Sequence, residues 1–291
     1  MYQQSPINII TKNAKFNKSL KTLTLNYNNR SAYRLINTGN TVKVLCNLTY
    51  PMTIVSGPLK YNYTVEEIHL HWGKDNLIGS EHAINGKRYS GEIHIVHWNS
   101  SKYSNFNEAY NSPDGIAIIA IFLELGNYNV ALQQITSNAH MITYKNSSLD
   151  IYNFNPKVLF PNILDYWYYN GSSTNIHINN VHWLVFKNPI TISYSQLDDL
   201  RKLQSTTTDT VPKQYIYDNF KNPNNAISKL QLLSSFKTSS YDEECFLDKI
   251  NIFTKLTPST FIILIIVFIL LSSIVVIGFF FIHKSPRKDK M

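Results

Sequence analysis

The feature that most constrains this chain is a long apolar run close to its C-terminus. Residues 261–282 read FIILIIVFILLSSIVVIGFFFI and contain no charged side chain. As a helix that rises about 1.5 Å per residue, this run spans about 33 Å, the thickness of one bilayer core. It predicts a transmembrane anchor at 258–283 in the lipid bilayer. A body at 1–236 and a polar stalk at 237–257 precede it, and a short basic tail at 284–291 follows it.

The two ends of the chain give conflicting signals about membrane topology. The start, MYQQSPINII, lacks the basic and apolar regions of a secretory signal peptide. The tail, KSPRKDKM, is basic and is expected on the cytoplasmic side or its topological equivalent. Either the body stays on the same side as the tail, with the apolar run as a hairpin, or the membrane is acquired by a route other than secretion.

Short runs of β-forming residues, broken by Asn, Gly and Pro, fill the body. Their alternation and spacing predict a mainly β (α+β) domain with few helices. Strands are expected at residues 22–27, 41–46, 68–72, 92–98, 115–125 and 180–186. Brief helices are expected at 130–139 and at 195–203, the second capped by Ser195.

Basic residues are concentrated near the N-terminus. The chain has a net charge of +8, and its first 65 residues hold eight bases and no acid. A basic face binds sulfated polyanions through several Lys and Arg contacts, whereas scattered bases are only a solvated surface. Nucleic acid is not expected as a partner, because the chain has no recognisable nucleic-acid motif. The candidate bases are Lys12, Lys15, Lys18, Lys21, Arg30, Arg34, Lys43 and Lys60.

The two cysteines occur in different settings. Cys46 ends an alternating apolar run and is expected to be a small core residue. Cys245 lies in the stalk, where a buried packing role is not expected. In an oxidising compartment it would form an interchain disulfide and link a homodimer.

Three histidines have a spacing typical of metal sites. His69 and His71 are two residues apart, so on a strand they share one face. Glu92 and His94 share a face of a second predicted strand. Three imidazoles from two strands offer zinc a site with a fourth position open for water, which is typical of catalytic zinc. Alone, this pattern is weak, and ordinary strand histidines are the alternative.

The residues that flank these histidines resemble those of α-class carbonic anhydrases. The resemblance rests on IHLHWG, GSEHAINGKRYSGEIHIVHW, QSPINI, DGIAIIAIFLELG, VHWLVFKNPITIS and DNFKNP, and covers about residues 3–236. It implies a large twisted, mostly antiparallel sheet with peripheral helices. It also implies that His69, His71 and His94 bind zinc, although a folded domain with an empty site remains the alternative.

The same resemblance assigns roles around the ligands, residue by residue. Glu92 matches the carboxylate that orients the third ligand, and Glu67 stands where the family has Gln beside the first. The main chain of Asn219 matches the partner of the second ligand, and such groups fix imidazole tautomers. Glu81 matches the acid that orients an active-site threonine. The walls of the carbon dioxide pocket match Val96 and Ile118.

Three departures from the family bear on catalysis. The proton-shuttle histidine is replaced by Asn40, which cannot carry a proton near neutral pH. In the loop after Gly171 the threonine position falls on Ser173 or Thr174, depending on a one-residue gap, and both stiffening prolines are missing. The aromatic N-terminal extension of the soluble enzymes is absent. These departures weigh against fast turnover and leave enzymatic activity open.

The whole arrangement resembles the carbonic-anhydrase-like envelope proteins of poxviruses. Proteins of that family adsorb virions to chondroitin sulfate, a glycosaminoglycan on host cells. Poxvirus membranes form in the cytoplasm, so their proteins need no secretory signal. The resemblance implies a single-pass protein of the virion membrane, with the body outside the virion and the tail inside. The expected function is host-cell attachment. The alternative is a membrane-anchored zinc carbonic anhydrase that hydrates carbon dioxide.

Overall fold

The computed structural model describes residues 4–20, 22–172, 179–226 and 230–237. The described residues belong to the first of two units, Met1–Lys237. No helix within the described residues is long and apolar enough to cross a membrane. The predicted stalk, anchor and tail lie outside the described residues, as do four candidate residues, namely Lys21, Ser173, Thr174 and Cys245.

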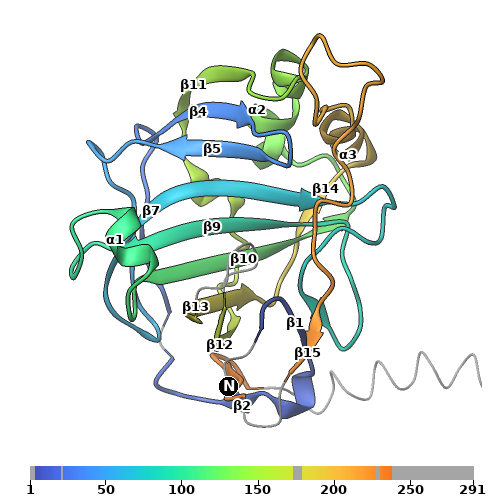
Figure 1. Ribbon diagram of the computed structural model, residues 1–291. Helices are drawn as coiled ribbons and strands as arrows, with labels where there is room; N and C mark the ends of the chain where they lie inside the picture. Colours follow the sequence, from blue (N-terminus) through green and yellow to red (C-terminus); the bar gives the residue numbers. More distant parts are fainter. Residues whose placement is uncertain (1–3, 21, 173–178, 227–229, 238–291) are drawn as a thin grey trace, which may run out of the picture. The chain divides into compact units, whose positions relative to one another are not determined.

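The first unit is built on one large twisted sheet, which confirms the mainly β fold (Figure 1). The strands on its main path, in spatial order, are β11 (Ser148–Phe154), β4 (Ala32–Asn37), β5 (Val42–Cys46), β7 (Leu59–Trp72), β9 (Gly91–Asn99), β10 (Ile116–Leu125), β13 (Asn179–Phe186), β12 (Tyr166–Ser172), β16 (Leu233–Ser234) and β2 (Lys15–Phe16). Most neighbours are antiparallel, but β10 and β13 are parallel, so the sheet is mixed.

Shorter strands complete the unit. β14 (Ile190–Ile192) pairs with β10, and β6 (Thr53–Ser56) pairs with both β7 and β3 (Thr24–Asn26). A separate small sheet has the order β15 (Asn224–Asn225), β1 (Ile7–Ile9) and β8 (Ala83–Ile84). All six strands expected from the sequence are present, although β7 begins nine residues before the predicted start at 68.

The helices are few and short. They are α1 (Phe106–Tyr110), α2 (Gln133–Thr136) and α3 (Tyr194–Arg201), with 3₁₀ turns η1 (Thr11–Asn13), η2 (Val130–Leu132), η3 (Ala139–Ile142) and η4 (Pro156–Leu159). The brief helix expected at 130–139 is present over residues 130–136 as η2 followed by α2, and η3 begins at Ala139. Thr136 and Asn138 bond their side chains to the carbonyls of Leu132 and Gln134, and such local bonds compete with a regular helix.

The N-cap of α3 is Ser193, which corrects the expected cap at Ser195. The hydroxyl of Ser193 accepts from the N–H of Gln196, and the side-chain oxygen of Gln196 accepts from the N–H of Ser193. This reciprocal pair satisfies two N–H groups at the helix start. Ser195 lies within the first turn of the helix.

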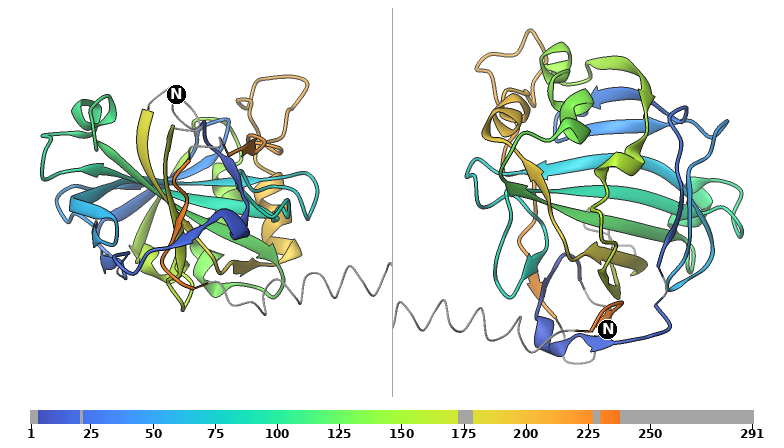
Figure 2. Two further views of the ribbon diagram at one scale, coloured as in Figure 1. Left: turned by 90° about the horizontal axis from the view of Figure 1, so that it is seen from below. Right: turned by 180° about the vertical axis from the view of Figure 1, so that it is seen from behind.

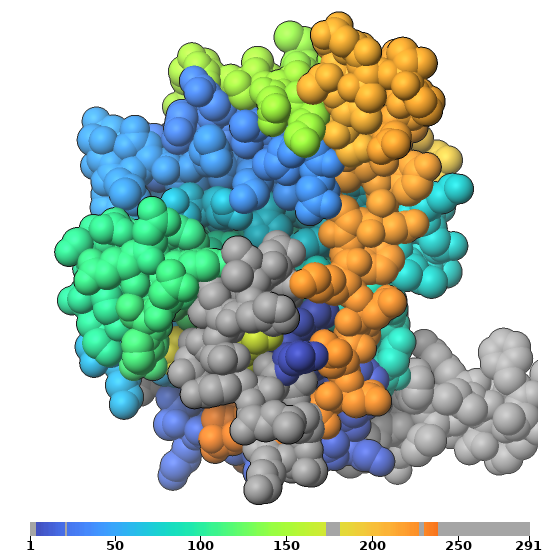
Figure 3. Space-filling model, in the orientation of Figure 1, coloured from blue at the N-terminus to red at the C-terminus, as the bar shows by residue number. Residues whose placement is uncertain are grey.

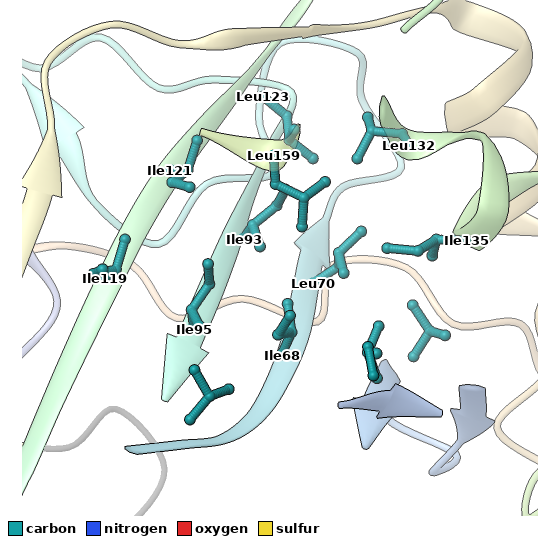
Figure 4. Packing of buried hydrophobic residues seen from close by; sticks show 14 of the residues in the cluster. Ile68, Leu70, Ile93, Ile95, Ile119, Ile121, Leu123, Leu132, Ile135 and Leu159 are labelled. Atoms are coloured by element: carbon teal, nitrogen blue, oxygen red, sulfur yellow. The ribbon is translucent and has the colours of Figure 1, made fainter. Parts of the chain in front are cut away.

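The main hydrophobic core lies between one face of the sheet and α2, α3, η2, η3 and η4. Ile68 and Leu70 of β7 and Ile93 and Ile95 of β9 point toward residues of α2, η2 and η4 (Figure 4). Seen from behind, these helices and turns lie over that face of the sheet (Figure 2). Cys46 is partly buried against this core, and burial raises the pKa of its thiol to about 12. Because alternate residues of β7 and β9 fill the core, the residues between them must face the opposite side.

Candidate metal centre

The three candidate histidines lie on neighbouring strands, on the face opposite the main core. β7 and β9 are antiparallel, with His69 directly across from His94 and His71 across from Glu92. The sequence predicted two ligands on one strand and a third on its neighbour, and the register places them in this way. The pairing of core residues Ile68 and Ile95 fixes the register.

The three imidazoles converge on one buried point. Their ring centroids lie 4.6–5.2 Å apart, and their exposed fractions are 5% or less. Nε2 of His71 is 3.2 Å from Nδ1 of His94. The nitrogen atoms of this group lie within 4.8 Å of one another, so the group could hold a metal ion.

Each imidazole is oriented by a partner on the nitrogen that faces away from this point. Nδ1 of His69 is 3.1 Å from Oε1 of Glu67, and Nδ1 of His71 is 2.8 Å from the carbonyl oxygen of Asn219. Nε2 of His94 is 2.7 Å from Oε1 of Glu92. Because each partner oxygen can only accept, each of these nitrogens carries the proton, and the other nitrogen of each ring keeps its lone pair.

The arrangement of lone pairs fits a tetrahedral zinc ion. Nε2 of His69 is buried and has no hydrogen-bond partner among the described residues. Zinc–nitrogen bonds of about 2.0–2.1 Å in a tetrahedral site place the ligand nitrogens about 3.3 Å apart. The separation of 3.2 Å between His71 and His94 agrees with that value. The centre therefore has the ligand type, the tautomers and the spacing that zinc requires.

A second group that could hold a metal consists of His82, Glu92 and His94. Oε1 of Glu92 is 2.7 Å from both Nδ1 of His82 and Nε2 of His94. His82 in turn contacts the hydroxyl of Tyr169 through Nε2 at 2.8 Å. The hydrogen bonds to Glu92 use the nitrogens that would have to bind a metal. This group therefore supports the first site and does not form another.

Burial favours the neutral form of two of these histidines, His69 and His94. It lowers the pKa of His94 to about 4, and it also lowers the pKa of His69. For the carboxylates, burial alone would raise the pKa. The hydrogen bonds and charges of His82 and His94 nevertheless hold the pKa of Glu92 well below its usual value. His69 and Lys43 lower the pKa of Glu67 to about 2. Neutral imidazoles beside carboxylates are the protonation states that metal binding needs.

Glu81 lies beside the centre, and only one of its two carboxylate oxygens has a hydrogen-bond partner among the described residues. Its Oε1 accepts from the N–H of Lys221 at 3.0 Å. Its Oε2 is buried and has no hydrogen-bond partner within the part of the chain that the structure describes. The resemblance pairs this acid with the hydroxyl of Ser173 or Thr174, and both residues lie outside the described part.

An apolar surface adjoins the three histidines. Val96 and Ile118 are cross-strand partners on β9 and β10, and both are at least nine-tenths buried. The ring of Trp183 lies 5.1 Å from that of His94 and is fully buried. These side chains belong to a smaller hydrophobic cluster on the histidine side of the sheet. At the rim, Asn40 is exposed, and its carbonyl accepts from the side chain of Asn219 at 2.9 Å.

The candidate glycan-binding bases are distributed over the unit. Lys12 and Lys15 lie in η1 and β2, at one end of the sheet order, whereas Arg34 lies in β4 near the other end (Figure 1). Arg34 pairs with Asp150 at 2.6 Å. The ammonium of Lys43 lies 2.7 Å from Oε2 of Glu67. The pairing of Lys43 puts this base beside the metal centre.

The remaining candidate glycan-binding bases within the described residues are exposed. Arg30 lies over the ring of Tyr50 at 4.1 Å, and Lys60 is exposed near the start of β7. Lys18 is exposed just after β2.

Two residues near the centre were not found from the sequence. Lys43 was assigned only to the basic surface. The alternation of residues 41–46 indicated a strand, but the pairing of Lys43 with His69 is seen only in the structure. Arg88 carried no signal, because its contacts come from segments distant in the sequence. Its guanidinium donates to the carbonyl of Ser80 and to the side chain of Asn222.

Comparisons with known proteins agree with this geometry. Residues 1–230 match the sequence model of the family described as eukaryotic-type carbonic anhydrase. Carbonic anhydrase 7 of Mus musculus is 39% identical over 223 residues, which cover 76% of this chain and 84% of that protein. Carbonic anhydrase 1 of Oryctolagus cuniculus is 37% identical over 218 residues, covering 75% and 93%. Carbonic anhydrase 3 of Sus scrofa is 39% identical over 211 residues, covering 72% and 81%.

Proposed function

Because this chain belongs to the eukaryotic-type carbonic anhydrase family, we propose that its three-histidine centre binds zinc and that the domain hydrates carbon dioxide. One observation carries the proposal. His69, His71 and His94 direct unprotonated nitrogens at one point, and each ring is fixed from behind by Glu67, the Asn219 carbonyl or Glu92. When bound, zinc supplies a Lewis acid that brings the pKa of water to about 7.

The chain's own residues provide the rest of the reaction site. Val96, Ile118 and Trp183 form an apolar wall that excludes water and suits a small apolar substrate. The pKa of Glu81 is lowered, so Glu81 is an anion, and its Oε2, which has no partner among the described residues, is available to accept from a hydroxyl and orient it. Asn40 cannot carry a proton at the rim, so protons must leave through buffer. We therefore expect a hydration rate that rises with buffer concentration.

The test measures carbon dioxide hydration by stopped flow, using the zinc-loaded full-length chain. The His94→Ala variant is the matched control, because it removes one ligand and leaves the apolar wall in place. We expect buffer-dependent hydration by the wild type and a loss of activity in the variant. Hydration no faster than that of the variant at every buffer concentration would overturn the proposal.

A second function, attachment to chondroitin sulfate, is supported by a different observation. Lys12, Lys15 and Lys18 are exposed, and none of them has an ion pair among the described residues. Unpaired bases are available to a polyanion, and their binding falls steeply with salt. Under this proposal the domain lies outside a virion membrane, residues 258–283 anchor it, and Cys245 links a homodimer.

This second proposal is tested with the full-length chain over immobilised chondroitin sulfate, heparan sulfate and an unsulfated chain across a salt series. Saturable binding that prefers one sulfated chain and weakens with salt is expected. Equally weak binding to all three would overturn attachment. Zinc binding and attachment use different residues, so one proposal can fail without the other.

A further inference from the structure

Two main-chain groups of the metal centre come from one irregular segment, residues 218–222. The carbonyl of Asn219 accepts from His71, and the N–H of Lys221 donates to Glu81. This segment is neither helix nor strand, and β15 begins only at Asn224. Its orange ribbon runs along the side of the sheet in Figure 1, and its atoms belong to the orange band in Figure 3. Residues 218–222 pair with no strand, so contacts from other segments hold them in place.

The side chain of Arg88 joins this segment to the loop that carries Glu81. Nη2 of Arg88 donates to the carbonyl of Ser80, the residue before Glu81. Nη1 donates to Oδ1 of Asn222 at 3.1 Å. The guanidinium also lies 4.5 Å from the centre of the Phe220 ring. One half-buried side chain thus contacts both segments that supply the Glu81–Lys221 hydrogen bond.

Other contacts hold the first half of the segment. Oδ1 of Asp218 accepts from the N–H of Lys74 at 2.8 Å, and Oδ1 of Asn219 accepts from the N–H of Trp72 at 2.7 Å. These contacts tie the segment to the end of β7. Beyond Asn219, Arg88 contacts Phe220 and Asn222, and the N–H of Asn224 at the start of β15 donates to the carbonyl of Pro6 at 2.8 Å. Arg88 is therefore placed to fix Lys221 more than Asn219.

We propose that Arg88 is a positioning residue of the metal centre, which fastens residues 220–222 to the loop of Glu81 and so holds Glu81 beside His71 and His94. This inference rests on the zinc site proposed above. The planar guanidinium suits the role, because it donates in two directions and stacks on a ring at the same time. A lysine offers one compact charge and cannot make all three contacts.

The test compares Arg88→Met with Arg88→Lys and with the control Lys87→Met. Lys87 is the adjacent residue, and it forms an exposed ion pair with Glu124 away from the centre. In the full-length chain, we expect Arg88→Met to speed zinc release to a chelator by about 3- to 10-fold. This is less than the 10- to 100-fold effect of groups that touch the ligands directly. Arg88→Lys should fall between wild type and Arg88→Met, and the control should match wild type.

Hydrogen exchange of the Lys221 amide is the second readout, and it does not need zinc. In the metal-free chain, Arg88→Met should exchange faster at Lys221, while the N–H of Trp72 keeps its protection. A general loss of stability would instead speed exchange at both positions. Unchanged exchange at Lys221 in both Arg88 variants would overturn the inference. Failure of the wild type to bind zinc would overturn the proposed function, while exchange at Lys221 would still decide the role of Arg88.

Discussion

Nδ1 of His71 lies 2.8 Å from the carbonyl oxygen of Asn219, a residue 148 positions further along the chain. The side chain of Asn219 also accepts from the N–H of Trp72 and donates to the carbonyl of Leu70. One residue of an irregular segment therefore binds the end of β7 and fixes the tautomer of a candidate ligand. The centre therefore depends on a contact between segments that are far apart in the sequence.

Glu67 differs from the other carboxylates of the centre because it contacts both His69 and Lys43. We expect Glu67→Ala to weaken zinc binding about tenfold, because His69 then loses the acceptor that orients its ring, whereas Glu67→Gln restores the residue that the family has here and should bind zinc nearly as well as wild type. Competition with a chelator measures the affinity. Glu124→Gln is the matched control, because it breaks a Lys–Glu pair of 2.6 Å elsewhere. Equal affinities of Glu67→Ala and wild type would contradict the expected role.

Asn40 occupies an exposed turn at the rim of the centre. Asn40→His places a group there that titrates near neutral pH and can pass protons to solvent. We expect the hydration rate at low buffer concentration to rise at least about tenfold, and the rate at high buffer concentration to change little. Asn107→His, at an exposed position of α1, serves as the control. A variant as dependent on buffer as the wild type would count against proton release as the slow step.

His97 makes the stability of the fold depend on pH. It is fully buried, Nε2 contacts the hydroxyl of Tyr27 at 2.7 Å, and burial lowers its pKa to about 3. Between about pH 6.5 and pH 3 the unfolded chain binds a proton at this residue and the native chain does not. Stability therefore falls as pH falls through this window, by up to about 1.4 kcal/mol per pH unit.

Replacing His97 removes its share of this dependence. His97→Gln keeps an acceptor for Tyr27 but does not titrate. Between pH 6 and pH 4, we expect the variant to lose about 2–3 kcal/mol less unfolding free energy than wild type. Denaturant unfolding at several pH values measures this, with exposed His140→Gln as control. Equal losses in His97→Gln and wild type would show that His97 binds its proton as readily in the native state as in the unfolded chain.

The exposed lysines of the N-terminal region carry the attachment proposal. The double variant Lys15→Glu, Lys18→Glu should bind chondroitin sulfate several-fold more weakly and show a shallower salt dependence, because two lysine contacts to the anionic groups of the glycan are lost. Its melting temperature should stay close to that of wild type, since neither side chain is buried. Unchanged adsorption would remove this segment from the glycan-binding surface.

Much of the fold could be predicted because alternation and burial agree along its central strands. Ile68, Leu70, Ile93 and Ile95 fill the core, so the histidines between them had to face the other side. The start of β7 was missed because residues 60–62 are polar and exposed, and the strand there is held by pairing with β6 and β9. Local alternation carries no information about such pairing.

The placement of the candidate ligands was predictable where a motif carried it and not where the fold creates it. The spacing of His69 and His71, with His94 on a second predicted strand, indicated three imidazoles on one face, and the resemblance added the main chain of Asn219. The contacts of Arg88 join residues 8 and 134 positions away, and sequence spacing does not indicate them. The cap at Ser193 was displaced by two residues because Ser195 offers the same hydroxyl, and only the partner at Gln196 decides between them.

The most direct test of the account is the zinc content of the full-length chain, measured by mass spectrometry after purification without chelator and again after zinc is added and excess is removed. The account predicts about one zinc per chain for the wild type. It predicts loss of most of that zinc in His94→Ala, while the control His140→Ala keeps it. A wild type that holds no zinc after loading, or a His94→Ala variant that retains it fully, would contradict the proposed centre.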